Sequence, residues 1–142
     1  MADDIDVLVV EDDAAFATLI RLVFDQEASD LEVRTVQSGA EALEVLSSAA
    51  SAASATAAQP RRKPVLLLDL GLPDIPGTQL LALVRDDPTL REVPVAVLTG
   101  STAPQDLASC LELGVNAYIT KTEDLDDFIG HIRGVGRLLE LT

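Results

Sequence analysis

Short apolar runs alternate with stretches of helical periodicity along the whole chain. The clearest runs are residues 7–10, 65–68 and 95–98, and weaker ones cover residues 31–36 and 117–120. Runs of about four to six Val, Ile and Leu residues between amphipathic segments are typical of buried strands in a parallel sheet. The pattern therefore predicts an α/β domain of five strand–helix units, a doubly wound (βα)5 arrangement with helices on both faces of the sheet.

Each predicted helix has an apolar face that should pack on the sheet. Ser38 and Glu41 form a capping-box pattern before the second helix, while Pro88 and Gly114 are stop signals after the third and fourth. The predicted inner faces are, helix by helix, Phe16, Leu19, Ile20 and Val23; Ala42, Val45 and Leu46; Leu80, Leu83 and Val84; Leu107, Cys110 and Leu111; and Leu125, Phe128, Ile129, Ile132 and Leu139. The second and fourth strands are expected at residues 31–36 and 93–98.

Residues 47–63 interrupt this rhythm. The segment is rich in Ala and Ser, has no apolar periodicity and ends in Arg61, Arg62 and Lys63. Connections in compact α/β units usually span about 2–6 residues, so we interpret it as an insertion between the second helix and the third strand. Its alanines favour extension of the helix, but its small polar residues are also compatible with a flexible linker. The basic triplet is interpreted as a solvated loop end rather than a docking site.

Length and charge indicate a single soluble domain spanning residues 1–142. The chain has 24 acidic and 10 basic residues and a net charge of −14. Such a surface repels polyanions, so nucleic-acid binding is disfavoured. No apolar run reaches the roughly 18 residues of a membrane span, and the acidic N-terminus does not resemble a signal peptide. Cys110 is the only cysteine, so we expect no internal disulfide and a cytoplasmic location.

Polar residues follow four of the five runs. Glu11 and Asp12 come after the first run, Asp69 after the third, Thr99 after the fourth and Lys121 after the fifth. In an open parallel sheet, ligands bind outside the carboxyl ends of the strands, where the strand order reverses. These side chains should therefore converge on one crevice, and their chemistry suits a divalent cation and a phosphoryl group.

The residue types in this set favour phosphoryl transfer. Converging carboxylates repel one another unless a cation offsets their charge, and Mg2+ (or Mn2+) prefers carboxylate and phosphate oxygens. Asp69 stands alone at its strand end, which makes it the candidate nucleophile for an aspartyl-phosphate. Glu11 and Asp12 would hold the metal, while Lys121 and Thr99 would stabilise the phosphoryl oxygens.

Four segments, in order, resemble the motifs of response-regulator receiver domains. They are Val-Leu-Val-Val-Glu-Asp-Asp, Leu-Leu-Leu-Asp-Leu-Gly-Leu-Pro-Asp, Val-Pro-Val-Ala-Val-Leu-Thr-Gly-Ser and Ala-Tyr-Ile-Thr-Lys, and the resemblance covers the whole chain. It implies a flavodoxin-like sheet with strand order 2-1-3-4-5. It also implies Mg2+-dependent phosphorylation of Asp69 by a phosphohistidine on a sensor histidine kinase or a phosphotransfer protein.

The resemblance also implies individual roles for the site residues. The implied metal ligands are Glu11, Asp12, Asp69 and the main-chain carbonyl of Gly71; the phosphoryl contacts are Lys121 and Thr99; and the switch residues are Thr99 and Tyr118. Taken alone, Thr99 would be a turn residue and Tyr118 a half-buried aromatic with a solvated hydroxyl. The aromatic is expected to swing inward when the threonine turns toward the phosphoryl group.

Two positions depart from the family pattern. The family usually has a cis Pro after the lysine, whereas Thr122 follows Lys121 here. A cis bond before another residue type costs about 2.5–4 kcal/mol, so both cis and trans remain open and a trans bond would redirect the loop. Pro76 stands where an Asp commonly precedes the loop glycine, matched by Gly77, and we expect little effect.

Three further residues have simple structural interpretations. Asp13 is expected to cap the first helix rather than to bind metal as a third ligand. His131 falls off the apolar face of the last helix and should be solvated. Cys110 should act as a small hydrophobic residue. We expect no catalytic role for His131 or Cys110.

The predicted function is that of a stand-alone response regulator, because the last helix uses the chain up to Thr142. It would signal through phosphorylation-dependent contact with a downstream protein or by passing the phosphoryl group onward, as a monomer or weak dimer, without membrane binding. The alternative is a Mg2+-dependent phosphohydrolase. Such enzymes often need a second carboxylate two residues after the nucleophile, where this chain has Gly71, so we predict a signalling protein rather than an enzyme.

Overall fold

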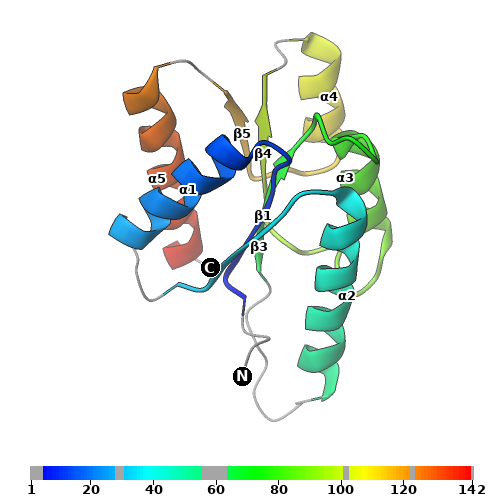
Figure 1. The fold of residues 1–142 in the computed structure, drawn as a ribbon. Helices are drawn as coiled ribbons and strands as arrows, with labels where there is room; N and C mark the ends of the chain where they lie inside the picture. Colours follow the sequence, from blue (N-terminus) through cyan, green and yellow to red (C-terminus); the bar gives the residue numbers. More distant parts are fainter. Residues whose placement is uncertain (1–4, 28–30, 56–63, 101–102, 122–123, 142) are drawn as a thin grey trace.

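Five strands and five helices alternate along the chain, in a computed structural model that describes residues 5–27, 31–55, 64–100, 103–121 and 124–141. They are β1 (Val7–Val10), α1 (Ala14–Glu27), β2 (Val33–Val36), α2 (Gly39–Ala55), β3 (Val65–Asp69), α3 (Gly77–Asp86), β4 (Val95–Thr99), α4 (Pro104–Glu112), β5 (Ala117–Thr120) and α5 (Leu125–Leu141). All neighbouring strands pair in parallel, in the order β2-β1-β3-β4-β5. The predicted flavodoxin-like (βα)5 fold is therefore confirmed (Figure 1).

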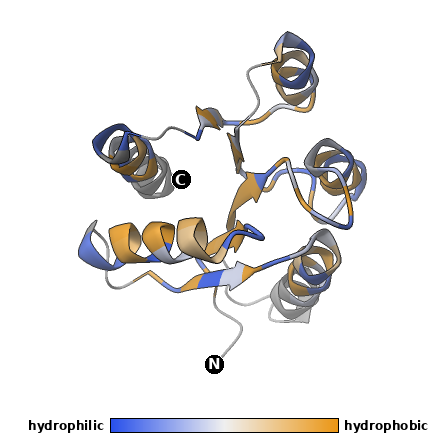
Figure 2. Cartoon of the chain, turned by 45° about the horizontal axis from the view of Figure 1, so that its top comes forward, coloured by the Kyte–Doolittle hydropathy of each residue, from blue (hydrophilic) through white to orange (hydrophobic). Residues whose placement is uncertain are grey.

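Helices cover both faces of the sheet (Figure 1). On one face, α1 and α5 pack through residues such as Phe24 and Phe128; on the other face, α2, α3 and α4 contribute Leu46, Leu80 and Cys110. β1, β3 and β4 are buried along their whole length, and Figure 2 shows them as an apolar layer between the helices. Burial on both faces is the reason that these strands have continuous apolar sequences.

Polar side chains cap the amino ends of α1 and α2, as predicted. Asp13 Oδ1 accepts a hydrogen bond from the Ala15 N–H at 2.9 Å, which confirms its capping role on α1. At the start of α2, Ser38 Oγ accepts the Glu41 N–H at 3.2 Å and lies 3.3 Å from Glu41 Oε1. These bonds satisfy N–H groups that have no partner inside a helix, so the local sequence fixes where each helix starts.

The insertion is helical as far as Ala55, because α2 spans Gly39–Ala55. Extension of the helix, rather than a linker, is thus the outcome for residues 47–55, in keeping with the helix propensity of Ala. Residues 56–63, with the basic triplet, lie outside the described residues. β2 and β4 begin at Val33 and Val95, later than predicted. Leu125 and Leu139 belong to α5, but their side chains are not among those described.

The predicted inner faces of α3 and α4 are partly wrong. Leu83 is 43% exposed, Leu107 is 40% exposed and Leu111 is 62% exposed, whereas Leu81 and Cys110 are buried. A helix turns about 100° per residue, so residues three positions before and one position after Cys110 point roughly 60° and 100° to one side of it. Periodicity alone does not say which flank of such an apolar stripe the sheet covers, and here Cys110 faces the core.

The chain makes a very close approach at Gly77, the first residue of α3. Its N–H donates a 3.0 Å hydrogen bond to the Leu70 carbonyl. A Cβ atom at this position would overlap the Leu70 backbone and lie 2.7 Å from the Asp69 carbonyl oxygen. Only glycine therefore lets α3 begin directly against the loop that follows β3, residues 70–76.

We expect Gly77→Ala to lower the free energy of unfolding by about 1–3 kcal/mol, because an inserted methyl group forces the backbone apart. The matched control is Gly130→Ala, since nothing lies within 4 Å of a Cβ at that position in α5. Alanine in an open helical position should stabilise by about 1 kcal/mol. Urea unfolding of both variants measures these changes, and a Gly77→Ala protein as stable as the wild type would contradict the close approach.

Candidate functional site

Three acidic side chains meet at the carboxyl ends of β1 and β3. Glu11 and Asp12 follow β1, and Asp69 is the last residue of β3. The parallel register pairs Val10 with Leu68, so the residues that come next lie side by side. One carboxylate oxygen from each of the three acids lies within 4.8 Å of the others. Glu11 is 1% exposed and Asp69 is 5% exposed, whereas Asp12 faces solvent.

Lys121 brings an ammonium group to two of these carboxylates. The residue follows β5, and its Nζ atom lies 2.5 Å from Glu11 Oε1 and 3.1 Å from Asp69 Oδ2. Its backbone N–H donates to the Thr99 carbonyl at 2.6 Å, which fixes the backbone next to the end of β4. Because β4 lies between β3 and β5, the long side chain extends past the end of β4 to reach the acids.

Asp69 is held at both of its carboxylate oxygens. Oδ1 accepts the Gly71 N–H at 2.9 Å, and Oδ2 accepts a hydrogen bond from Lys121. Burial alone would raise the pKa of Asp69, but its hydrogen bonds with Glu11, the Gly71 N–H and Lys121 together hold that pKa below its ordinary value. Asp69 is therefore ionised near neutral pH and fixed in orientation, which are the properties a carboxylate nucleophile needs.

Glu11 has the opposite electrostatics. Burial and, next, a hydrogen bond with Asp69 raise the pKa of Glu11 to about 8, and Lys121 offsets this only in part. The pKa of Lys121 is raised above its ordinary value, because the two carboxylates outweigh the effect of burial. Near pH 7, the group of Glu11, Asp69 and Lys121 therefore carries one proton more than three isolated side chains would.

This donor set fits a hard divalent cation. Glu11 Oε2 is buried and, as a carboxylate oxygen, finds no donor among the described residues; only a protonated Glu11 can share a hydrogen bond with Asp69. An unpaired buried carboxylate oxygen is unfavourable, so the site favours either a proton or a metal ion at this position. Three oxygens on one side, with Asp12 open to solvent, match the preference of Mg2+ for a few carboxylates plus water.

Thr99 and Tyr118 flank the cluster on β4 and β5. Thr99 is buried at the end of β4, next to the strand that carries Asp69. The Tyr118 ring packs against the core on the α4 side of the sheet, which includes Cys110. Its hydroxyl is buried and has no hydrogen-bond partner among the described residues, which differs from the solvated hydroxyl expected of Tyr118 taken alone. Burial, with Cys110 and Asp106 nearby, raises the pKa of Tyr118.

The remaining predicted residues are placed as follows. Asp13 belongs to the helix cap and not to the acidic cluster. His131 is exposed on α5, and Cys110 is buried, as predicted. Gly71 lies in the loop after Asp69 and contributes its N–H to that carboxylate. Thr122 and the geometry of its peptide bond lie outside the described residues.

Two residues near the site support it in ways that the sequence did not indicate. Phe16 was predicted only for the inner face of its helix, yet its ring lies 4.7 Å from Lys121 Nζ. Asp74 accepts hydrogen bonds from the N–H groups of Gly39 and Ala40 at 2.9 and 3.0 Å. These hydrogen bonds of Asp74 tie the loop after Asp69 to the start of α2. Gly39 and Asp74 are 35 positions apart in the sequence, so no local pattern could indicate the contact.

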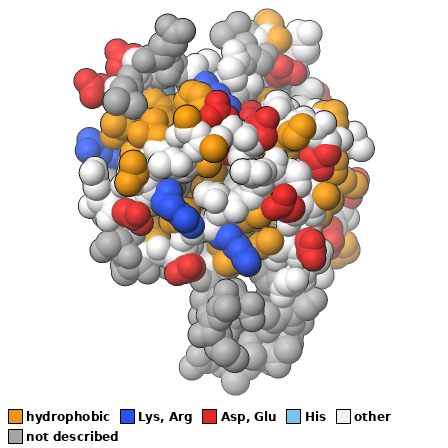
Figure 3. Space-filling view, viewed as in Figure 1, with side chains coloured by type: hydrophobic (Ala, Val, Ile, Leu, Met, Phe, Trp, Pro, Cys, Tyr) orange, Lys and Arg blue, Asp and Glu red, His pale blue; other side chains and the backbone are white. Residues whose placement is uncertain are grey.

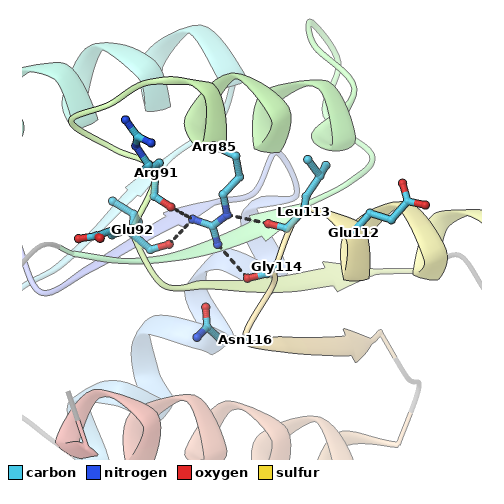
Figure 4. Close-up of a pocket in the computed structure, with 8 residues that line it drawn as sticks. Arg85, Arg91, Glu92, Glu112, Leu113, Gly114 and Asn116 are labelled. Carbon is cyan, nitrogen blue, oxygen red and sulfur yellow. Dashed lines mark hydrogen bonds between the residues drawn. The ribbon is translucent and has the colours of Figure 1, made fainter.

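A different polar cluster lies at the amino ends of β4 and β5, opposite the acidic site (Figure 4). There the Arg85 guanidinium donates hydrogen bonds of 2.7–3.0 Å to the carbonyl oxygens of Arg91, Val93, Leu113 and Gly114. Burial lowers the pKa of Arg85. Because backbone carbonyls take up these donors, Arg85 joins the α3–β4 loop to the end of α4 and acts as a structural cross-link.

Figure 3 shows acidic side chains spread over one face of the molecule with few basic ones between them, in keeping with the net charge of −14. In the part of the chain that the structure describes, none of the helices has the length and apolar character that a bilayer crossing needs.

A parallel five-stranded sheet with an acidic pocket and a lysine at its carboxyl ends defines the receiver class of signalling domain. The chain belongs to the response-regulator receiver domain family, whose model matches residues 7–133. Receiver domains accept phosphoryl groups from histidine kinases, bind Mg2+ or Mn2+ at the acidic pocket and signal to downstream proteins. They are signalling proteins in two-component systems rather than typical enzymes.

Three similar proteins illustrate this membership. Response regulator Rcp1 of Synechocystis sp. is 32% identical over 91% of this chain and 84% of its own length. A crystal structure of a Mn2+-bound form of response regulator Rcp1 matches with a TM-score of 0.73 at 31% identity, and the match covers 91% of this chain and 89% of the crystallised chain. The phosphorylated cyanobacterial phytochrome response regulator RcpA is 33% identical, with coverages of 92% and 89% and a TM-score of 0.73. A receiver domain from Rhodospirillum rubrum is 31% identical, with coverages of 97% and 95% and a TM-score of 0.82.

The raised pKa of Glu11 predicts a pH dependence of stability in metal-free buffer. The unfolded chain loses this proton near pH 4.5 and the folded protein near pH 8, so the contribution of Glu11 to the free energy of unfolding falls as the pH rises between these values. Glu11→Gln cannot titrate and should lose less stability over that interval.

Urea unfolding of both proteins between about pH 5 and pH 8.5, with a chelator present, measures this difference. Asp69 and Lys121 do not interfere, because the pKa of Asp69 is lowered and that of Lys121 is raised. Identical pH profiles for the wild type and Glu11→Gln would contradict the raised pKa.

Proposed function

We propose that the chain is a stand-alone, cytoplasmic response regulator that accepts a phosphoryl group on Asp69. The observation that carries this proposal is the buried Asp69 carboxylate, held between the Gly71 N–H and the Lys121 ammonium beside two further acids. Membership of the receiver family supports it. Gly71 offers no side chain for proton transfer, so the phosphohydrolase alternative gains no support.

The proposed reaction transfers a phosphoryl group from a phosphohistidine to Asp69. An Asp69 oxygen forms the new P–O bond as the P–N bond breaks, and the electron pair of the broken bond stays on the imidazole nitrogen of the donor. Lys121 and Thr99 stabilise the phosphoryl oxygens, since both lie at the neighbouring strand ends. Glu11, Asp12, Asp69 and the Gly71 carbonyl would hold Mg2+ or Mn2+, which when bound supplies positive charge against the phosphoryl oxygens.

The similar proteins suggest the class of phosphoryl donor. RcpA is described as a cyanobacterial phytochrome response regulator, and a bacteriophytochrome response regulator, RtBRR, is 34% identical with a TM-score of 0.70. We therefore propose a phytochrome-type sensor histidine kinase as the donor for this chain, directly or through a phosphotransfer protein.

The output surface is proposed to be the face formed by α4, β5 and α5. Leu107 and Leu111 of α4 are 40% and 62% exposed, so this helix offers apolar side chains to a protein partner. Tyr118 packs beneath the same helix. A contact that depends on the position of α4 would respond to phosphorylation of Asp69 through Thr99 and Tyr118.

Incubation with Mg2+ and a small acyl phosphate should add one phosphoryl group to the wild-type protein, labile to base and hydroxylamine. Intact-mass measurement should show no addition to Asp69→Asn, because an amide is a poor nucleophile. A chelator should abolish labelling by removing the positive charge that offsets the phosphoryl oxygens. The same base-labile addition to Asp69→Asn would show that Asp69 is not the acceptor.

The control for metal dependence compares two adjacent aspartates. Asp12 belongs to the acidic cluster, whereas Asp13 caps α1. Asp12→Ala should strongly raise the Mg2+ concentration needed for half-maximal labelling. Asp13→Ala should leave it unchanged and lower stability by about 0.5–2 kcal/mol. Equal shifts in both variants would mean that Asp13 also binds the metal.

Thr99→Ala should accept the phosphoryl group but fail to transmit the change. In the wild type, amide exchange around Tyr118 and α4 should change on phosphorylation or on addition of beryllofluoride, and the change should be absent in Thr99→Ala. A tenfold preference of a partner for the phosphorylated form needs only about 1.4 kcal/mol of differential contact. Unchanged exchange in the phosphorylated wild type would rule out this switch.

A further inference from the structure

The ring of Phe16 is a third contact of the Lys121 ammonium, beside the carboxylates of Glu11 and Asp69. Lys121 Nζ lies over the face of this ring, 4.7 Å from its centroid, while Glu11 and Asp69 contact the same ammonium at 2.5 and 3.1 Å. Phe16 belongs to α1, and its half-buried side chain is part of the core beneath that helix. The three contacts come from separate parts of the fold: Glu11 directly follows β1, Asp69 is the last residue of β3, and Phe16 lies in α1.

Phe16 is itself held in place by α5. Its ring meets that of Phe128 edge to face, with centroids 5.3 Å apart and ring planes at 70°. Phe128 is only 1% exposed, so it forms a fixed support. The face of Phe16 that meets Lys121 is therefore presented in one orientation, because aromatic pairs favour this perpendicular geometry.

A lysine side chain is a flexible stem with a compact charge, so carboxylates alone do not fix its direction. The face of an aromatic ring carries negative electrostatic potential and attracts an ammonium, more strongly when water is largely excluded. The Lys121 side chain is 17% exposed, which places this contact in a mostly desolvated setting.

We propose that Phe16 is a positioning residue for Lys121. It holds the ammonium against Asp69, so that the positive charge is in place when the phosphoryl group arrives. The inference rests on the proposed function for its effect on phosphoryl transfer, but the contact itself exists independently of that reaction.

The test compares Phe16→Leu with Phe16→Tyr and with a control in the same helix. Phe16→Leu keeps an apolar side chain but removes the ring, and Phe16→Tyr restores an aromatic face. Leu19→Ala removes apolar volume from the same partly buried layer of α1. Urea unfolding confirms that each variant is folded, and Phe16→Met replaces Phe16→Leu if the latter is not.

The first measurement is the proton chemical shift of the Lys121 methylene next to Nζ. Ring current should move it upfield in the wild type, Phe16→Tyr and Leu19→Ala, and the shift should vanish in Phe16→Leu. The second measurement is the rate of labelling by acetyl phosphate at saturating Mg2+. The labelling rate should fall about three- to tenfold in Phe16→Leu, as expected for loss of a largely desolvated cation–π contact. It should stay near the wild-type rate in Phe16→Tyr and Leu19→Ala.

A wild type without the upfield shift would overturn the proposal, and so would a folded Phe16→Leu protein labelled at the wild-type rate. An equal loss of rate in Leu19→Ala would also overturn it, because packing alone would then explain the effect. A wild type that is never labelled contradicts the proposed function instead, and the chemical shifts still decide whether Phe16 positions Lys121.

Discussion

Two carboxylates buried side by side, Glu11 and Asp69, are the constraint on which the rest of the site depends. Like charges in a buried pocket raise one another's pKa unless a cation compensates them. Hydrogen bonds with Glu11, the Gly71 N–H and Lys121 keep the pKa of Asp69 lowered, whereas burial raises the pKa of Glu11 to about 8 and Lys121 offsets this only in part. The site is therefore one positive charge short, which is the physical basis for its fit to a divalent metal ion.

The sheet makes this unfavourable arrangement possible. Asp69 ends a strand that is apolar and buried on both faces, so the stability of the core holds its carboxylate in place. The parallel register sets the ends of β1 and β3 side by side, and β5 supplies the lysine from two strands away. Around this frame, Gly77 allows the loop after β3 to lie close to α3, and Asp74 anchors the loop to α2.

The two ends of the sheet serve different purposes. At the amino ends of β4 and β5, the Arg85 guanidinium donates its hydrogen bonds to backbone carbonyls and so fixes the connections around α3 and α4. At the carboxyl ends, two buried polar groups, a Glu11 carboxylate oxygen and the Tyr118 hydroxyl, have no hydrogen-bond partner among the described residues. Unsatisfied buried groups favour ligand binding and rearrangement, whereas satisfied ones favour rigidity.

The sequence by itself determined the element order, the strands, the helix caps at Asp13 and Ser38 and the convergence of Glu11, Asp12, Asp69 and Lys121, because these depend on local periodicity and on the geometry of parallel sheets. Only the tertiary structure decided which flank of α4 faces the core, that the Tyr118 hydroxyl is buried, and that Phe16 and Asp74 support the site. Such contacts join residues distant in the chain, and their formation depends on how whole helices pack, which no local pattern records.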